Sequence, residues 1–412
     1  MGKALLINRG STVLSSGGER NLFGSVNNSG TESDSQANCT EGATFSNLRA
    51  NIIAGNSGTA TFRFRDAGAN GNQTFQITTT GINEDATNTD VLTAADLFTV
   101  SYVDTGTNST YAWMVGNVAF ASGHGNFHGL ADFVGAVFDV GDATQFIGLA
   151  GNLVNDGTAT EDNVEWKVRG YDTFEALQVR VTANARVNTS SFRNRINAGN
   201  GTGLVEFAGE ATGLVSDTLL ADAITDGQTI NVSITLATGV QDLTVKAICA
   251  TLKSSSNKSE TWCGNSAGLA RTASATAHYL PVGGYIDSLT ALTEAQARIK
   301  VGFAAVVSNL RCYLSANTYT GNGTLKLYQN GVAVITTTIT ASGGAGWYEN
   351  TSNTITIDAD DELSFEFDEG TSGSITIYSA GITFAPTAGP SIEGVLYGPR
   401  NYTDGLTSFW SR

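Results

Sequence analysis

The sequence has 412 residues, more than one ordinary domain core holds, so about two to four domains are expected. Its 48 Gly are accompanied by only 4 Pro, and 41% of its residues are hydrophobic, which excludes a disordered or collagen-like chain. The formal net charge of −16 implies an acidic surface that repels phosphate groups, which argues against nucleic acid and membrane surfaces as partners.

Residues 1–19 precede the first repeated segment and are expected to form an N-terminal arm. The arm contains an apolar run, Leu5, Leu6 and Ile7, that is too short for a signal peptide. No stretch of 18 apolar residues occurs, so no membrane-spanning helix is expected. Because exposed apolar side chains lower solubility, these three residues either pack on their own domain or dock to another protein.

Three landmarks recur in the same order, which indicates three copies of one unit. The first is Thr-Glu, whose glutamates are Glu32, Glu161 and Glu294. The second begins 13 residues past each glutamate, at Phe45, Phe174 and Val307. It contains an identical Ser-Asn-Leu-Arg in copies 1 and 3. The third is a strand entered through an acidic turn, which starts at Ala95, Asp226 and Asp360.

Apolar and polar residues alternate within each copy, as in strands that turn one face to a core. Phe62, Leu327 and Phe365 are therefore expected in the core, and Arg63 and Lys326 at the surface. Pairs such as Asn-Gly tolerate the positive φ of tight hairpins and separate the short strands. The pattern predicts an all-β chain of three tandem antiparallel β-sandwich domains.

The non-repeating stretches set the expected boundaries. The sandwich repeats are predicted over residues 20–120, 146–252 and 273–386. Residues 121–145 are expected as a Gly-rich linker, 253–272 as a Ser/Asn-rich linker and 387–412 as a C-terminal tail, which carries Phe409 and Trp410 as further candidate docking residues. The stretch Leu289–Val301 has helical propensity, but it aligns with Thr160–Arg169, where apolar residues alternate, so both are expected to be strands.

Candidate ligand groups are few. His124 and His128, with Asp132, have metal-ligand spacing only on a helix, and the glycines around them favour a plain loop. The acidic stretch Asn83–Asp90 and the cluster at 358–362 are either calcium loops or solvated turns. No catalytic residue, metal site or cofactor site is predicted.

The four cysteines, Cys39, Cys249, Cys263 and Cys312, have no zinc-binding spacing. They are expected to be free, mostly buried thiols. A bond between Cys249 and Cys263 across a loop is the alternative.

The ordered pattern of Thr-Glu, Ser-Asn-Leu-Arg, Asn-Gly and Asp-x-Leu-Ser-Phe resembles a module of tailed-phage virion proteins. Such modules belong to the jelly-roll class that resembles tumour necrosis factor and complement C1q. Copy 3 matches best, whereas copy 2 departs at Glu175 and Ala176 and lacks Asn-Gly. The resemblance implies jelly-roll domains, a virion location and trimeric assembly. Synthesis in the host cytoplasm is expected because the N-terminal apolar run is too short for a signal peptide. A single chain acting as a pseudo-trimer is the alternative to a trimer of chains.

The expected function is that of a non-enzymatic virion structural protein, most favourably a capsid-associated decoration protein of a tailed bacteriophage. Its partners would be other virion proteins of the capsid or tail. The alternative is a fibre or receptor-binding adhesin whose loops recognise a host glycan or protein. A carbohydrate-active enzyme with a jelly-roll core is the third hypothesis, disfavoured because the repeats share no reaction centre.

Overall fold

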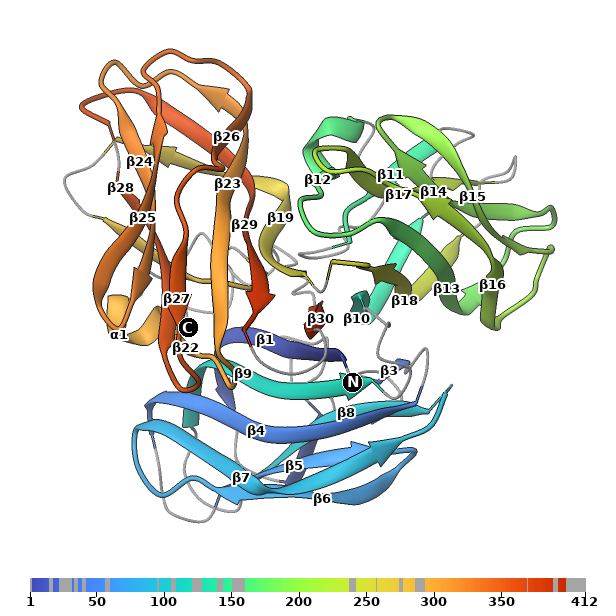
Figure 1. The fold of residues 1–412 in the computed structure, drawn as a ribbon. Helices are drawn as coiled ribbons and strands as arrows, with labels where there is room; N and C mark the ends of the chain where they lie inside the picture. The colour runs from blue at the N-terminus through green and yellow to red at the C-terminus, as the bar shows by residue number, and fades with distance from the viewer. Residues whose placement is uncertain are drawn as a thin grey trace, which may run out of the picture.

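The computed structural model describes residues 2–14, 18–21, 32, 36–38, 42–55, 60–94, 96–104, 109–120, 128–138, 144–149, 160–236, 242–256, 258–273, 277–285, 293–368, 370–387 and 392–397. These residues form three two-sheet β-sandwiches, drawn in blue to cyan, in green to olive-yellow and in yellow to red in Figure 1. The predicted fold class is confirmed: the described chain is nearly all β, and its strands pair antiparallel except for the parallel pairs β1–β30 and β19–β21.

Copy 1 has nine strands. They are β1 (Gly2–Leu14), β2 (Gly18–Asn21), β3 (Ala37–Asn38), β4 (Ala43–Ala54), β5 (Thr61–Asp66), β6 (Ala69–Gln76), β7 (Gly81–Leu92), β8 (Leu97–Asp104) and β9 (Ser109–Phe120). One sheet has the order β1-β9-β4-β7, and the other has the order β2-β8-β5-β6, with β3 paired to β8.

Copy 2 repeats this arrangement. Its elements are β10 (His128–Phe138), β11 (Thr144–Ile147), the 3-10 turn η2 (Glu161–Val164), β12 (Trp166–Lys167), β13 (Thr173–Asn184), β14 (Ser190–Ile196), β15 (Gly199–Phe207), β16 (Gly213–Ala223), β17 (Thr229–Thr235) and β18 (Leu243–Lys253). The sheets are β10-β18-β13-β16 and β11-β17-β14-β15, with β12 paired to β17.

Copy 3 repeats it again, and a last strand follows. The elements are β19 (Ser259–Thr272), β20 (His278–Pro281), β21 (Gly284–Tyr285), α1 (Glu294–Ala297), β22 (Ile299–Lys300), β23 (Ala305–Asn317), β24 (Gly323–Gln329), β25 (Val332–Ile339), β26 (Gly346–Asn350), β27 (Ile355–Ile357), β28 (Glu362–Asp368), β29 (Ser374–Pro386) and β30 (Ile392–Tyr397). Its sheets are β21-β19-β29-β23-β26, with β27 paired to β23, and β20-β28-β24-β25, with β22 paired to β28.

The strand order makes each copy a jelly roll. In copy 1 the first main strand pairs with the eighth (β1 with β9), the second with the seventh (β2 with β8), the third with the sixth (β4 with β7) and the fourth with the fifth (β5 with β6). Copies 2 and 3 pair their strands in the same way. Two such nested sheets are the jelly-roll architecture.

The expected arm and linkers are strands in the structure. Residues 2–14 form β1, which pairs with β9, and the stretches expected as linkers contain β10 and β19, the equivalent strands of copies 2 and 3. The expected tail contains β30, which pairs in parallel with β1. In β19 the residues Ser259–Gly264 are all buried, so both faces of the strand are covered and no apolar–polar alternation marks it in the sequence.

The Thr-Glu landmark marks a helical turn, which corrects the expectation of strands over 160–169 and 289–301. In the described part of these stretches the strands are β12 and β22, and η2 and α1 precede them. Thr293 caps α1 in a capping box with Gln296, whose side chain accepts a hydrogen bond from the Thr293 amide at 3.0 Å. A single turn is too short for a helical period to appear in the sequence.

The landmark glutamate fixes a hairpin in each copy. Glu32 pairs with Arg65 at 2.6 Å, and Arg65 also donates to the Gly68 carbonyl of the β5–β6 turn at 2.7 Å. Glu161 and Arg195 repeat this at 2.8 Å, with Arg195 donating to the Ala198 carbonyl. In copy 3 the arginine does not come from the hairpin strand, as Arg65 and Arg195 do, but directly follows α1. Arg298 pairs with Glu294 at 2.5 Å and lies against Gly331 of the β24–β25 turn.

Copy 2 keeps the backbone of its sisters where its sequence departs. Ala176 has a φ of 50°, as Asn47 (52°) and Asn309 (54°) have at the same bulge of copies 1 and 3. The hairpin that lacks Asn-Gly turns through Asn197 and Ala198, which both have positive φ, as a two-residue type I′ turn requires.

Candidate functional site: the junctions between the copies

The three sandwiches contact one another in a closed cycle, and in each contact a short segment near the landmark glutamate of one copy faces the first sheet of another copy. At the 3–1 junction, α1 and β22 of copy 3 face β4 and β9 of copy 1. At the 2–3 junction, η2 and β12 of copy 2 face β19, β23 and β29 of copy 3. At the 1–2 junction, β3 of copy 1 faces β10 of copy 2. The first strands of the copies approach one another at the centre, where β30 contacts all three copies (Figure 1).

The arginine of Ser-Asn-Leu-Arg makes the equivalent contact at two junctions. Arg49 of copy 1 donates to the Lys300 carbonyl of copy 3 at 2.5 Å. Arg311 of copy 3 donates to the Lys167 carbonyl of copy 2 at 2.9 Å. Lys167 and Lys300 hold the same register place in β12 and β22. The identical motif found in the sequence is therefore the residue pattern of the junction.

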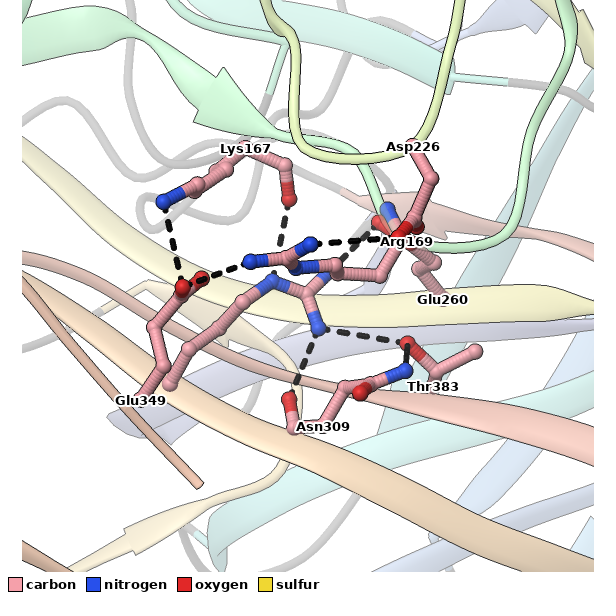
Figure 2. Close-up of polar contacts among 8 residues, drawn as sticks. Lys167, Arg169, Asp226, Glu260, Asn309, Glu349 and Thr383 are labelled. Atoms are coloured by element: carbon pink, nitrogen blue, oxygen red, sulfur yellow. Dashed lines mark hydrogen bonds and ion pairs between the residues drawn. The ribbon is translucent and has the colours of Figure 1, made fainter. Parts of the chain in front are cut away.

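The 2–3 junction contains a fully buried ion pair, and Figure 2 labels its acid, Glu260, together with Lys167, Arg169 and Glu349 nearby. The Arg311 Nη2 lies 2.6 Å from Oε2 of Glu260, and both side chains are almost completely buried. Glu260 also accepts a hydrogen bond from Trp262 Nε1 at 3.0 Å and one from the backbone amide of Arg169. Burial raises the pKa of Glu260 and lowers that of Arg311, and the attraction between the two charges opposes both shifts.

Aromatic rings continue this contact. The Arg311 guanidinium lies 4.2 Å from the centre of the Trp262 ring, a cation–π arrangement. Trp166 of copy 2 stacks on Trp262 of copy 3 with ring centres 5.5 Å apart and planes 9° from parallel. Trp347 packs edge-on against Trp262, with ring centres 5.8 Å apart. Buried aromatic and arginine anchors of this kind carry most of the energy of protein interfaces.

A lysine and a glutamate bridge the same two junctions. Lys167 Nζ lies 3.1 Å from Glu349, which Arg169 also contacts at 2.6 Å. Lys300 Nζ lies 3.5 Å from Glu84. Glu84 and Glu349 hold the same place, because each pairs in register with the junction arginine of its copy. The sequence carried a signal for the lysines, since each follows its landmark glutamate by six residues.

The 1–2 junction has neutral residues at all three of these places. Asn38 stands where the lysines stand, Gln178 where the arginines stand and Ser216 where the glutamates stand. Among the described residues, Gln178 Oε1 is buried without a hydrogen-bond partner. The arginine, lysine and glutamate thus occur together or are replaced together, as expected for three residues of one contact.

The predicted docking residues fall partly within the described structure. Leu5, Leu6 and Ile7 lie in β1, where they pair in register with Asn117, Gly116 and Val115 of β9 and with β30. This register places Leu5 where copy 3 has Glu260. Phe409 and Trp410 lie outside the described residues. The docking role of these five residues stays a prediction.

The candidate calcium stretch at 83–90 is part of β7, and its carboxylates bind the protein itself. Asp85 accepts hydrogen bonds from the backbone amides of Thr74 and Thr87 at 2.9 and 3.1 Å, and Asp90 accepts one from the backbone amide of Gln73 at 2.9 Å. Asp217 and Asp222 repeat these contacts in copy 2 with the amides of β15. In both copies these aspartates bind backbone amides at the edge strand of the second sheet, β6 or β15, which would otherwise be unpaired. The acidic stretch is therefore a structural part of the sheet edge, which the interpretation as a solvated turn did not include.

This arrangement predicts a pH dependence. Burial alone would raise the pKa of Asp85, but hydrogen bonds from Asn88, Thr74 and Thr87 lower it to about 2. A lowered pKa means that the stabilisation by Asp85 is complete above the ordinary carboxyl range, near pH 3.8, and is lost as the pH falls through about 2. The melting temperatures of the wild type and of Asp85→Asn, measured from about pH 5 to 2, should therefore converge at the acid end. A constant difference over this range would contradict the prediction.

The remaining candidates resolve into structural groups. Asp361 accepts hydrogen bonds from Gln329 and Asn330 at 2.5 and 2.6 Å and so supports the β24–β25 hairpin. His124 lies outside the described residues, and His128 and Asp132 lie in strand β10 and not on a helix. Cys263 and Cys312 are buried free thiols, which rules out the bond between Cys249 and Cys263. Over the described part of the chain, no group of three or more possible metal ligands and no helix long and apolar enough to span a membrane are found.

No protein-family model and no curated protein sequence matches the chain. Among solved structures, the chain is similar to one from the infectious bursal disease virus Gx strain, with 12% sequence identity over 64% of this chain and 73% of that chain and a TM-score of 0.18. A chain of the infectious bursal disease virus VP2 subviral particle gives 9% identity, 85% and 74% coverage and a TM-score of 0.20. At such TM-scores these likenesses carry no argument about the function of this chain.

Proposed function

We propose that the chain is a non-enzymatic virion structural protein in which one polypeptide does the work of a trimer of jelly-roll subunits. The observation that carries this proposal is the repeated contact at the junctions, where Arg49 and Arg311 reach the equivalent backbone carbonyls of the next copy. Head-to-tail contacts of one kind close into a ring when the rotation allows it, as in cyclic oligomers. Here that ring lies within a single chain.

A decoration protein on the capsid of a tailed phage is the role we favour. The buried residues of this chain serve packing between strands and between copies, as in a component whose task is shape and adhesion. The resemblance of the three landmarks to virion jelly-roll modules points to the same role. The partners would then be capsid proteins, recognised through surfaces outside the junctions.

The pseudo-trimer makes an additional trimer of chains unnecessary. Sedimentation velocity of the purified protein should therefore give the mass of one chain over a wide range of concentration. Sedimentation as three chains would instead support the expectation of a homotrimer and would remove the argument that the closed ring replaces one.

An adhesin role is the second candidate, and one feature of copy 3 favours it. A groove of about 460 Å³ runs between the edge strands β25 and β26, and its wall is mostly polar. It is lined by Thr336, Thr337, Thr338, Glu349, Asn350, Thr351, Ser352 and Asn353. Hydroxyl and amide groups of this kind can bind the hydroxyls of a glycan.

Immunogold labelling of phage particles that encode the chain tests both candidates. Antibodies against the purified protein should label the whole head surface if the chain decorates the capsid. Labelling confined to the tail tip or fibres would support the adhesin, and unlabelled particles would overturn the virion role. Deletion of residues 1–19 does not separate the candidates, because it removes β1 from the copy 1 sheet and so damages the fold itself.

A further inference from the structure

We infer that the ring has two mechanical parts, a rigid block of copies 2 and 3 and a copy 1 that opens and unfolds by itself. This inference concerns the joints within the molecule and holds whether or not the chain belongs to a virion. It rests on the division of the apolar core, on the ion pairs at the junctions and on the place of β30.

The apolar core is divided between these parts. The buried apolar side chains of copies 2 and 3 form one continuous cluster that runs through Trp166 and Trp262. Those of copy 1 form a cluster of their own. Among the copy 1 side chains that the structure describes, Val115 is the one fully buried residue that joins the larger cluster, with Ile53 and Ile82 packed at its margin. Because elements that share a core unfold together, copies 2 and 3 should behave as one cooperative unit.

The polar contacts divide the molecule in the same way. Across the 2–3 junction, Lys167 and Arg169 of copy 2 both pair with Glu349 of copy 3, at 3.1 and 2.6 Å. Across the 3–1 junction, Lys300 pairs with Glu84 at the longer distance of 3.5 Å. The junction arginines differ too, because Arg311 has the Glu260 carboxylate of its own copy as a direct partner. At the 3–1 junction Arg49 is 2% exposed, yet its contacts among the described residues are the Lys300 carbonyl and, at 3.5 Å, the Asn117 side-chain oxygen. Burial lowers the pKa of Arg49 to about 10. Because a buried charge without a close counter-charge opposes burial, this junction is easier to open.

The 1–2 junction also holds copy 1 weakly. Its equivalent places carry Asn38, Gln178 and Ser216, so the ion pairs of the other junctions cannot form there. Beside the contacts of the 3–1 junction, copy 1 is tied to the block by β30, which follows copy 3 in the chain and pairs with β1 of copy 1. Strand β30 therefore acts as a strap between the two parts, and its release frees copy 1.

Hydrogen exchange of the full chain, followed by mass spectrometry at increasing denaturant, measures each opening separately. Phe62, Phe192 and Leu325 are matched probes, because they are fully buried and hold the same register place in β5, β14 and β24. Phe62→Ala should speed exchange in β4 and β9 on the order of 100-fold and leave copies 2 and 3 unchanged. Phe192→Ala and Leu325→Ala should each speed exchange in both copies 2 and 3.

Two outcomes would overturn the inference. One is a Phe192→Ala chain in which β13 and β17 exchange faster while β23 and β28 do not. The other is a Phe62→Ala chain in which all three copies exchange faster by the same factor. If an alanine variant does not fold, Phe62→Leu and Phe192→Leu give the same comparison with a smaller change. A chain that ends after Thr387 lacks β30 and should show faster exchange in copy 1 alone.

Discussion

Replacement of Arg311 by alanine is expected to destabilise the chain by about 3–5 kcal/mol, because it leaves the Glu260 carboxylate buried without a counter-charge. The guanidinium also donates to the Lys167 carbonyl and lies on the Trp262 ring, so the 2–3 junction loses its central anchor. Urea unfolding followed by tryptophan fluorescence measures the loss, since Trp166 and Trp262 report on this junction.

The matched control removes both charges. Arg311→Met with Glu260→Gln should cost clearly less than Arg311→Ala, because no charge is left uncompensated in the interior. The loss in Arg311→Ala should also shrink as the pH falls. Burial raises the pKa of Glu260 in the folded variant, so the penalty is complete above that pKa and disappears once Glu260 takes up a proton. A loss that is equal in both variants and independent of pH would mean that packing, and not charge, holds the junction.

Replacement of Phe365 by alanine is expected to cost about 3–5 kcal/mol through the cavity that it leaves. Phe365 lies in β28, is fully buried and pairs in register with Leu327 of β24 and Leu280 of β20. Because copies 2 and 3 share one core, the midpoint of their common unfolding transition should fall. Calorimetry of the full chain measures this shift.

Two surface residues serve as controls for Phe365→Ala. Arg63 lies on the outer face of β5, and its change to alanine should cost about 0.5 kcal/mol or less. Lys326 should cost more, because its ammonium pairs with Glu366 at 2.7 Å and the Glu366 side chain is 4% exposed. The alternation along the strand predicted that Lys326 is a surface residue whose replacement costs little. The nearly buried Glu366 carboxylate would lose its partner in Lys326→Ala, so the expected loss of stability is larger. Equal losses for Phe365 and Arg63 would show that the strand faces are assigned incorrectly.

Local patterns predicted the fold class and the repeat well. Phe45, Phe174 and Val307 are fully buried and lie at the same place in β4, β13 and β23, as the constant spacing from the landmark glutamates indicated. The alternation at Phe62 and Phe64 gave the faces of β5 correctly. These features depend on neighbours in the sequence, which is why a single sequence contains them.

Local sequence patterns did not predict the contacts between segments that lie far apart in the sequence. The arginine of Ser-Asn-Leu-Arg was visible as a repeat, but its partner is a backbone carbonyl in another copy, which has no sequence signature. Glu260 lies in a stretch expected as a linker, because β19 is covered on both faces and shows no strand period. Its role follows only from the meeting of β19, β23 and β12, which the sequence does not encode locally.

At the 1–2 junction, Asn38, Gln178 and Ser216 stand where the other two junctions have lysine, arginine and glutamate. Such a difference between interfaces is possible because the three copies are joined in one chain. In an assembly of identical subunits every substitution is imposed on every interface at once, so a change that weakens one weakens all. A chain that contains its own three interfaces is free of that constraint, and selection can alter one interface while the others keep their charges. Fusion thus turns a symmetric particle into one whose sides can evolve apart, each toward its own neighbour.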